Sequence, residues 1–272
     1  LARGLGVDFH HETDVHTITL RRGKVVGVMS ERGHHPAEIV VFNGDISALA
    51  QGLLGRGAAR GNSETPRDGR SLSAVTWAME AQPEGVELLH HNVFFSANYP
   101  AEFDSLLRHG RVPTEPTVYI CAQDRAEESL GTTPELERLL VLVNAPPNGD
   151  EPHRWGEAER TQCTIAMANI LRRAGLRLKS EASIQTTPVE FHRLFPATGG
   201  ALYGPRSKGS RSVLARTGAS TRVRGLYLAG GSVHPGAGVP MAALSGRLAA
   251  ERILEDQGLT GRFRRAATSG TT

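Results

Sequence analysis

The sequence has 272 residues, of which 31 are Lys or Arg and 28 are Asp or Glu, so its formal net charge is +3. Apolar residues make up 39% and charged residues 22%, a balance typical of globular proteins. The basic residues are scattered among acidic ones and form no stripe interleaved with aromatic side chains. No apolar run reaches the ~18 residues of a membrane span. These features exclude a nucleic-acid partner and a transmembrane helix.

The cysteines and paired histidines do not suggest a metal site. Cys121 and Cys163 are far apart and in no CxxC spacing, so we interpret them as reduced thiols of a cytoplasmic protein. Adjacent residues of a strand point to opposite faces, which makes it hard for two neighbouring histidines to share one ion. We therefore expect no metal at any of the three pairs, His10-His11, His34-His35 and His90-His91.

The N-terminal segment predicts short strands. Leu1–Gly6 is similar to the last turn of a helix that closes on glycine, and we expect that further chain precedes it. Strands are predicted at 7–10, 15–21, 24–30 and 38–42, with Arg22-Gly23 as a two-residue turn. The pattern indicates a strand, a small antiparallel crossover and a return strand.

The middle of the chain, from residue 46 to 221, mixes helical and strand patterns. Apolar, β-branched and aromatic content predicts strands at 71–79, 86–97, 117–122 and 139–144. Helices are predicted at 102–108 and 157–174, and the Gly- and Arg-rich stretch 55–70 is predicted to be a loop. A mixed sheet with helices is the resulting expectation.

A glycine-rich segment near the C-terminus is the strongest functional signal. A strand at 225–230 leads into a glycine-rich loop at 231–238, and a helix with Pro240 in its first turn follows. Glycine lets the backbone approach a ligand, and the free N–H groups of a helix N-terminus stabilise negative charge. The segment therefore predicts a site for a polar or anionic group. The alternative is a small-residue helix with a glycine-rich entry and no ligand, since no GxGxxG is present.

The stretch from Gly225, GLYLAGGSVHPGAGVPMAALSGRLAAERI, strongly resembles the C-terminal signature of phytoene-desaturase-type carotenoid desaturases. Further resemblance is found at VFNGD (41–45), HNVFFS (91–96), PTVY (116–119), VNAP (143–146), TP (187–188) and GALYG (200–204), so it covers most of the chain. His234 to Met241, with Gly230-Gly231, is most similar to the branch of 1-hydroxycarotenoid 3,4-desaturases, also called methoxyneurosporene dehydrogenases.

This resemblance implies an α/β (α+β mixed) fold, the C-terminal part of a two-domain, Rossmann-like FAD-binding flavoprotein with a mixed-sheet substrate domain. Residues 1–45 would be part of the FAD-binding domain, 46–221 the substrate domain, 222–256 the C-terminal FAD-binding segment and 257–272 a flexible tail. The family's GxGxxG is absent from the sequence. We therefore expect a missing N-terminal half of the same protein to carry it.

The resemblance also assigns the cofactor-binding residues. Val239, Pro240 and Met241 would contact the isoalloxazine of FAD through the backbone, and Gly238 would let the loop approach it. The ribityl–diphosphate part would pass the strand end, and Val15 would contact adenine. The full cofactor set is Val15, Gly230, Gly231, Ser232, Gly238, Val239, Pro240 and Met241. His234 is a candidate for hydrogen bonding a substrate oxygen, or for a bond that only stabilises the loop.

The implied reaction is FAD-dependent desaturation of a hydroxylated or methoxylated acyclic C40 carotenoid by hydride transfer to the flavin. Because the polyene can delocalise the resulting cation, no catalytic side chain is assigned. The enzyme would be cytoplasmic and peripherally associated with the membrane surface. Two alternatives stay open: another amine-oxidase-like FAD oxidoreductase, or a non-catalytic or truncated product. The aromatic set Trp77, Phe94, Phe95 and Tyr99 is expected in the sheet core, or in part along a substrate tunnel.

Overall fold

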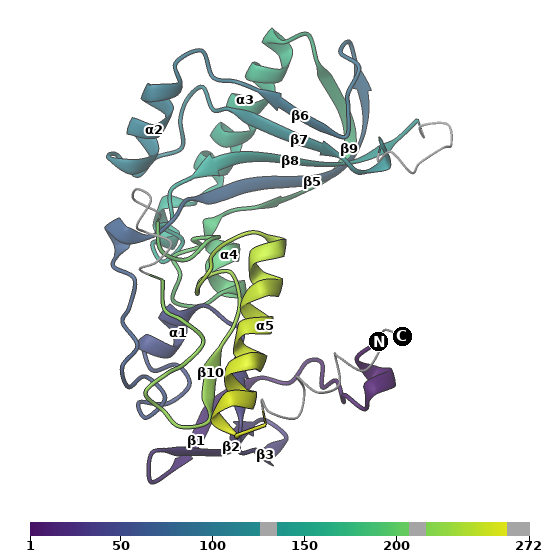
Figure 1. The fold of residues 1–272 in the computed structure, drawn as a ribbon. Coiled ribbons are helices and arrows are strands. Elements are labelled where there is room, and N and C mark those ends of the chain that lie inside the picture. The colour runs from purple at the N-terminus through teal and green to yellow at the C-terminus, as the bar shows by residue number, and fades with distance from the viewer. Residues whose placement is uncertain (126–134, 207–215, 260–272) are drawn as a thin grey trace, which may run out of the picture. The chain divides into compact units, whose positions relative to one another are not determined.

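The computed structural model describes residues 1–125, 135–206 and 216–259, which fall into two compact units (Figure 1). Unit 1 combines Leu1–Glu64 with the chain after residue 206, and unit 2 is Thr65–Arg206. This division differs from the borders expected at 45/46 and 221/222. The physical reason is burial, because Ile46 and Leu49 belong to the same apolar cluster as Val25 and Leu226 of unit 1.

Unit 1 contains a three-stranded antiparallel sheet in the order β1-β2-β3. β1 (Val15–Arg21) and β2 (Lys24–Ser30) are joined by the predicted turn, in which Arg22 and Gly23 both have positive φ, 50° and 76°. Such a turn matches the twist of paired strands. β3 (Gly33–Pro36) completes the sheet. The strand predicted at 7–10 is wrong: the segment is irregular, and Val7 and Phe9, which would share one face of a strand, stay about half exposed.

The N-terminus and the second sheet of unit 1 agree more closely with the elements predicted from the sequence. A single 3-10 turn, η1 (Arg3–Leu5), ends at Gly6 in the left-handed region, as predicted. β4 (Val40–Phe42) pairs in parallel with β10 (Leu226–Leu228), so that Val41 lies opposite Tyr227. β4 is shorter than the predicted strand at 38–42. The helices of this unit are α1 (Ile46–Ala50) and α5 (Val239–Asp256).

Unit 2 is built on a five-stranded sheet in the order β6-β7-β8-β5-β9. The strands are β5 (Ser73–Glu84), β6 (His91–Phe94), β7 (Val118–Ala122), β8 (Glu137–Ala145) and β9 (Arg177–Thr186). All of these pairings are antiparallel, so the sheet is not the mixed one that was expected. Strand direction alternates from β6 through β7 and β8 to β5, which sets Ile120 of β7, for example, opposite Val141 of β8.

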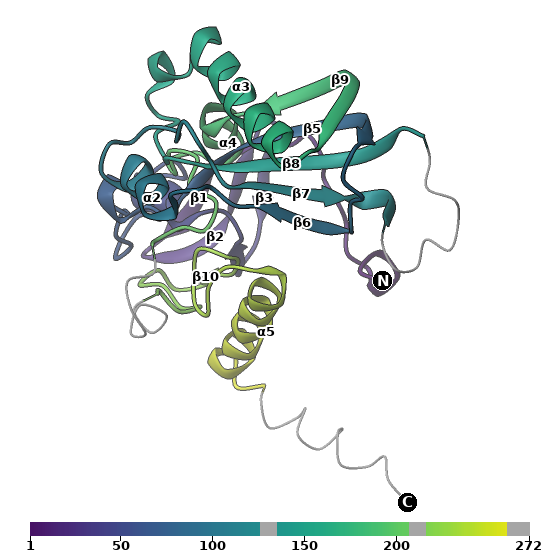
Figure 2. The same ribbon diagram turned by 90° about the horizontal axis from the view of Figure 1, so that it is seen from above.

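Helices of unit 2 are α2 (Tyr99–Leu107), α3 (Glu157–Arg173) and α4 (Pro188–Leu194), with 3-10 turns η2 (Arg67–Gly69), η3 (Gln123–Arg125) and η4 (Pro152–Arg154). α3, predicted at 157–174, lies along one face of the sheet (Figure 2). Its Cys163, Met167 and Ile170 share an apolar cluster with Trp77 of β5. The α/β fold class is confirmed. No helix of the described residues is long and apolar enough to span a membrane.

Candidate functional site

The glycine-rich loop connects the C-terminal end of β10 to the first turn of α5. Gly238 is the N-cap of α5, with φ 104°, and no other atom lies within 4 Å of the position where a Cβ would stand. Pro240 is in the first turn, where its missing N–H costs no helical bond. Val239 is 85% exposed and Met241 39%. The N-terminus of this 18-residue helix is therefore open, with no side-chain cap.

One serine holds the start of the loop against the helix. The backbone N–H of Gly230 donates to Ser245 Oγ at 2.7 Å, and Ser245 Oγ donates in turn to the carbonyl oxygen of Ala242 at 2.6 Å. Ser245 is only 1% exposed. A Cβ on Gly230 would lie 2.8 Å from Oδ1 of Asn43, at the end of β4, and the φ of Gly230 is 119°. Glycine is therefore required here both by conformation and by space.

The middle of the loop faces the N-terminus of α1. Ser232 is 9% exposed, and its Oγ accepts a long hydrogen bond of 3.4 Å from the N–H of Ile46. Asp45 is the N-cap of α1 and accepts from the N–H of Ser47 at 2.8 Å. Arg216 donates to the carbonyl oxygen of Gly231 at 3.0 Å. Burial lowers the pKa of Arg216, while the nearby charge of Asp45 acts in the opposite direction.

Seven of the eight predicted cofactor residues lie together, and Val15 lies apart from them. Gly230, Gly231, Ser232 and Gly238 follow one loop, and Val239, Pro240 and Met241 form the exposed start of α5. Val15 instead begins β1, in the other sheet of unit 1, opposite Ser30. The backbone N–H of His234 donates to the carbonyl oxygen of Thr217 at 2.8 Å, so its backbone does stabilise the loop.

Three positions that shape the site were not identified as such from the sequence. In the sequence, Ser245 is one of several small residues of the helix, and Asn43 is part of the family-like stretch 41–45. Arg216 lies outside every motif. A serine seven residues after a glycine N-cap, facing back to the strand end, is a signal that could have been used for Ser245.

The residues present fit a bound flavin. The uncapped N–H groups and positive end of α5 suit a group that carries negative charge, and the open space at Gly238 leaves room for its close approach. The loop lies at the carboxyl end of β10, the end at which ligands bind in parallel α/β sheets.

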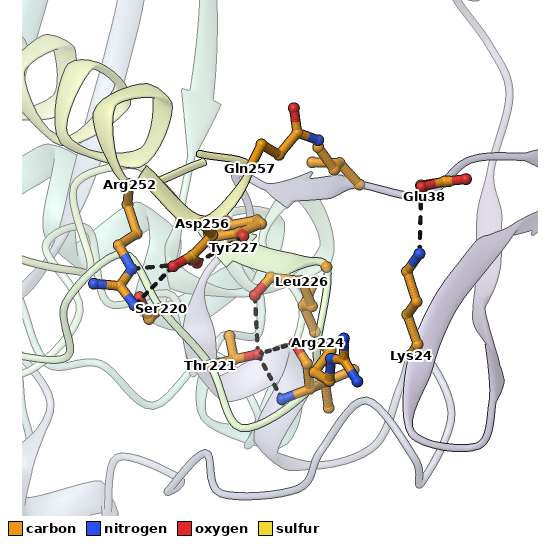
Figure 3. Close-up of a pocket in the computed structure, with 13 residues that line it drawn as sticks. Lys24, Glu38, Ser220, Thr221, Arg224, Leu226, Tyr227, Arg252, Asp256 and Gln257 are labelled. Carbon is orange, nitrogen blue, oxygen red and sulfur yellow. Dashed lines mark hydrogen bonds and ion pairs between the residues drawn. The ribbon is translucent and has the colours of Figure 1, made fainter. Parts of the chain in front are cut away.

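A second feature of unit 1, a cavity of about 480 Å³, lies near the other end of β10 (Figure 3). Its lining is largely polar, and hydrogen bonds and ion pairs join several of the lining side chains to one another. Tyr227 donates its hydroxyl to Asp256 at 2.9 Å, and Arg252 forms an ion pair with the same carboxylate at 2.9 Å. Burial and the bond to Asp256 raise the pKa of Tyr227. Lys24 pairs with Glu38 at 3.3 Å across the lining. Because it lies at the amino end of the strand, we assign this cavity no cofactor role.

Comparison with known proteins identifies the family. Residues 1–254 match the flavin containing amine oxidoreductase family, so the chain belongs to it. A hydroxyneurosporene desaturase of Rubrivivax gelatinosus is 46% identical over 99% of this chain and 52% of its own length. A 1-hydroxycarotenoid 3,4-desaturase of Flavobacterium sp. is 30% identical over 93% of this chain and 51% of its own. Among solved structures, an oxidoreductase from Methanosarcina mazei covers 89% of this chain and 49% of its own at a TM-score of 0.48 and 16% identity.

These findings confirm the resemblance to carotenoid desaturases. They also confirm membership of a flavin-dependent oxidoreductase family, which agrees with the expected cofactor FAD. The chain spans about half the length of the curated relatives it matches.

Proposed function

We propose that the protein carrying this chain is a FAD-dependent desaturase of a hydroxylated or methoxylated acyclic C40 carotenoid. The observation that carries the proposal is the open, glycine-capped N-terminus of α5. The chain belongs to the flavin containing amine oxidoreductase family, and two of its relatives are named for carotenoid desaturation. The overall reaction removes two hydrogens from adjacent saturated carbons and extends the conjugated system.

In this proposal the chain contributes position and electrostatics. FAD, when bound, supplies the hydride acceptor. The N–H groups of Val239 and Met241 would hold the ring and stabilise negative charge on it, because both belong to the uncapped first turn of α5. Gly238 keeps that approach free of a side chain. Gly230, Gly231 and Ser232 would border the ribityl–diphosphate part, and Val15 the adenine.

His234 is the one loop ring that could hydrogen-bond an oxygen of the substrate. Its backbone is already fixed by the bond to Thr217 at 2.8 Å, which would hold the ring at a constant position along the loop. We assign no acid or base to the chemistry. A polyene can spread the positive charge left by hydride loss, so a protein group need not neutralise it.

We further propose that unit 2 contacts the cytoplasmic membrane surface, from which an apolar C40 substrate would be drawn. Phe95 is 70% exposed and Tyr99 48%, with their rings 6.2 Å apart, and the Tyr99 ring is 5.0 Å from that of Phe103. Leu89 is 72% exposed. Of the aromatic residues expected in the sheet core, only Trp77 is fully buried, at 2%. Exposed aromatic side chains of this kind suit a membrane interface.

The decisive experiment is to incubate the purified, flavin-loaded protein with membranes and a 1-hydroxycarotenoid and to follow the visible spectrum. Desaturation lengthens the conjugated chain and shifts the carotenoid absorption to the red. A parallel incubation with a primary amine, in which the release of hydrogen peroxide is measured, tests the amine-oxidase alternative. Flavin-loaded protein that leaves the carotenoid spectrum unchanged would refute the assignment.

The cofactor contact is tested separately with Gly238→Val. The substitution forces a β-branched residue to a φ of 104° and fills the open space at the helix N-terminus, so flavin retention should be lost. Gly246→Ala is the matched control, since Gly246 lies on the same helix and also has no atom within 4 Å of its Cβ position. Unchanged flavin content in Gly238→Val would place the contact elsewhere, while circular dichroism shows whether the variant has folded.

A further inference from the structure

Three side chains with metal-binding atoms meet at the start of β6 in unit 2. One nitrogen each of His90 and His91 and the sulfur of Cys121 all lie within 4.8 Å of one another. The β6–β7 pairing creates this arrangement, because it sets His91 directly opposite Cys121. The expectation that neighbouring histidines point apart does not apply here. His90 precedes the strand, in a bend, and the two imidazole rings stand 4.2 Å apart.

The hydrogen bonding of His90 prepares it as a ligand. Its Nδ1 is 2.9 Å from the carbonyl oxygen of Ala122, and a carbonyl can only accept, so Nδ1 carries the proton. In the neutral ring the lone pair is therefore on Nε2, which is the nitrogen that lies 4.0 Å from Cys121 Sγ. A backbone carbonyl behind a histidine is the arrangement that orients imidazoles at metal centres.

His91 has a comparable partner. Its Nδ1 is 2.8 Å from the hydroxyl oxygen of Tyr119, and the two rings are stacked with centroids 6.0 Å apart. When Tyr119 accepts this bond, Nε2 of His91 is left as the ligand atom. Tyr119 is two residues from Cys121 on the same strand, so both side chains project from the same face of β7. Both histidines are thus held by oxygen atoms on their Nδ1 side.

We propose that His90, His91 and Cys121 bind one Zn²⁺ ion. Imidazole nitrogen and thiolate sulfur are the ligands that zinc prefers, at ~2.0 Å and ~2.3 Å. At a tetrahedral ion these bond lengths put the ligand atoms ~3.5 Å apart, so the cluster closes by about 1 Å, which rotation of the exposed His91 side chain supplies. Three protein ligands leave the fourth position to water. Bound zinc would fasten β6, the edge strand of the sheet, to β7.

The test uses Co²⁺ as the probe, added to the chelator-treated, flavin-loaded protein and followed by difference spectra against the metal-free protein. Binding through a thiolate gives a sulfur-to-cobalt charge-transfer band and tetrahedral visible bands. One equivalent of Co²⁺ per chain should produce them, and Zn²⁺ should abolish them by displacement. Cys121→Ser should remove the charge-transfer band, and His90→Ala and His91→Ala should weaken binding by at least about 10–100-fold.

Cys163→Ser is the matched control, because the second cysteine is buried in α3 and should leave the spectrum unchanged. Tyr119→Phe removes only the partner of His91 and should weaken binding by about 10-fold while keeping the charge-transfer band. Far-ultraviolet circular dichroism identifies any variant that has not folded. The proposal is overturned if saturating Co²⁺ gives no thiolate band, or if the band persists in Cys121→Ser.

Discussion

Ser245→Ala tests how the strand end and the helix are tied together. The substitution removes the oxygen that accepts the Gly230 N–H at 2.7 Å, at a position that is 1% exposed. Leaving a buried donor without a partner costs about 1–3 kcal/mol. Alanine regains up to about 0.5 kcal/mol through its better helix propensity. The net expected loss is about 0.5–3 kcal/mol in the free energy of unfolding of unit 1.

Urea denaturation of both proteins measures this loss. At an m value of ~2 kcal/mol/M the midpoint should fall by about 0.25–1.5 M. Hydrogen exchange gives a local reading, because the Gly230 amide should exchange faster in the variant while amides of β5 and β8 in unit 2 stay unchanged.

The control is Ser105→Ala on α2. Ser105 Oγ also donates to a carbonyl oxygen of its own helix, that of Ala101 at 3.0 Å, but within the described residues it accepts from no distant backbone N–H. Its replacement should change stability by less than about 0.5 kcal/mol. If Ser245→Ala and Ser105→Ala have the same effect, the bond to Gly230 does not hold the loop.

Further expectations concern three other sites. Burial alone would raise the pKa of Glu190, but bonds from Arg160 and Thr187 outweigh it and lower the pKa to about 2. The charge of Glu190 therefore stabilises the fold above pH 4.5, the ordinary pKa of a glutamate. The difference in unfolding free energy between wild type and Glu190→Gln should shrink as pH falls from 4.5 towards 2. A constant difference in urea titrations would contradict this. Burial and the charge of Glu159 raise the pKa of Cys163 to about 12. Mass spectrometry should therefore find Cys163 unalkylated after treatment with iodoacetamide at pH ~8, until the protein is unfolded. Rapid labelling of the folded protein would contradict this. Gly246→Ala should raise the unfolding free energy by about 0.5–1 kcal/mol in a thermal melt, because the added Cβ meets no other atom; a lower melting temperature would contradict this.

Local patterns predicted the elements whose signal is contained in a few neighbouring residues. The turn at Arg22-Gly23 and the helix from Glu157 were found because turn chemistry and helical periodicity are local. The strand at 7–10 was wrong because the segment pairs with no described strand and leaves Val7 and Phe9 about half exposed. β9 and α4 were not predicted: β9 is a largely polar strand, so its place in the sheet comes from pairing with β5 rather than from its own pattern.

The candidate site was predictable where a long motif covers it and not where distant segments meet. The loop and the helix start were named from residues 225–253 alone. Asn43 restricts Gly230 from another strand, and Arg216 reaches Gly231 from outside the motif. The histidine and cysteine cluster was missed because the strand begins at His91 rather than at residue 86, which leaves His90 free of the alternation rule.

The parallel pairing of β4 with β10 has a consequence for synthesis. A ribosome releases Val40 long before Leu226, so β4 waits without its neighbour while the whole of unit 2 is made. Unit 2 is one continuous stretch and can close its sheet during that interval, whereas unit 1 cannot. A message cut before the codon for Leu226 would yield chains whose β4 edge stays unpaired, and such edges recruit other chains. Incomplete translation products of this protein should therefore aggregate through their early strands.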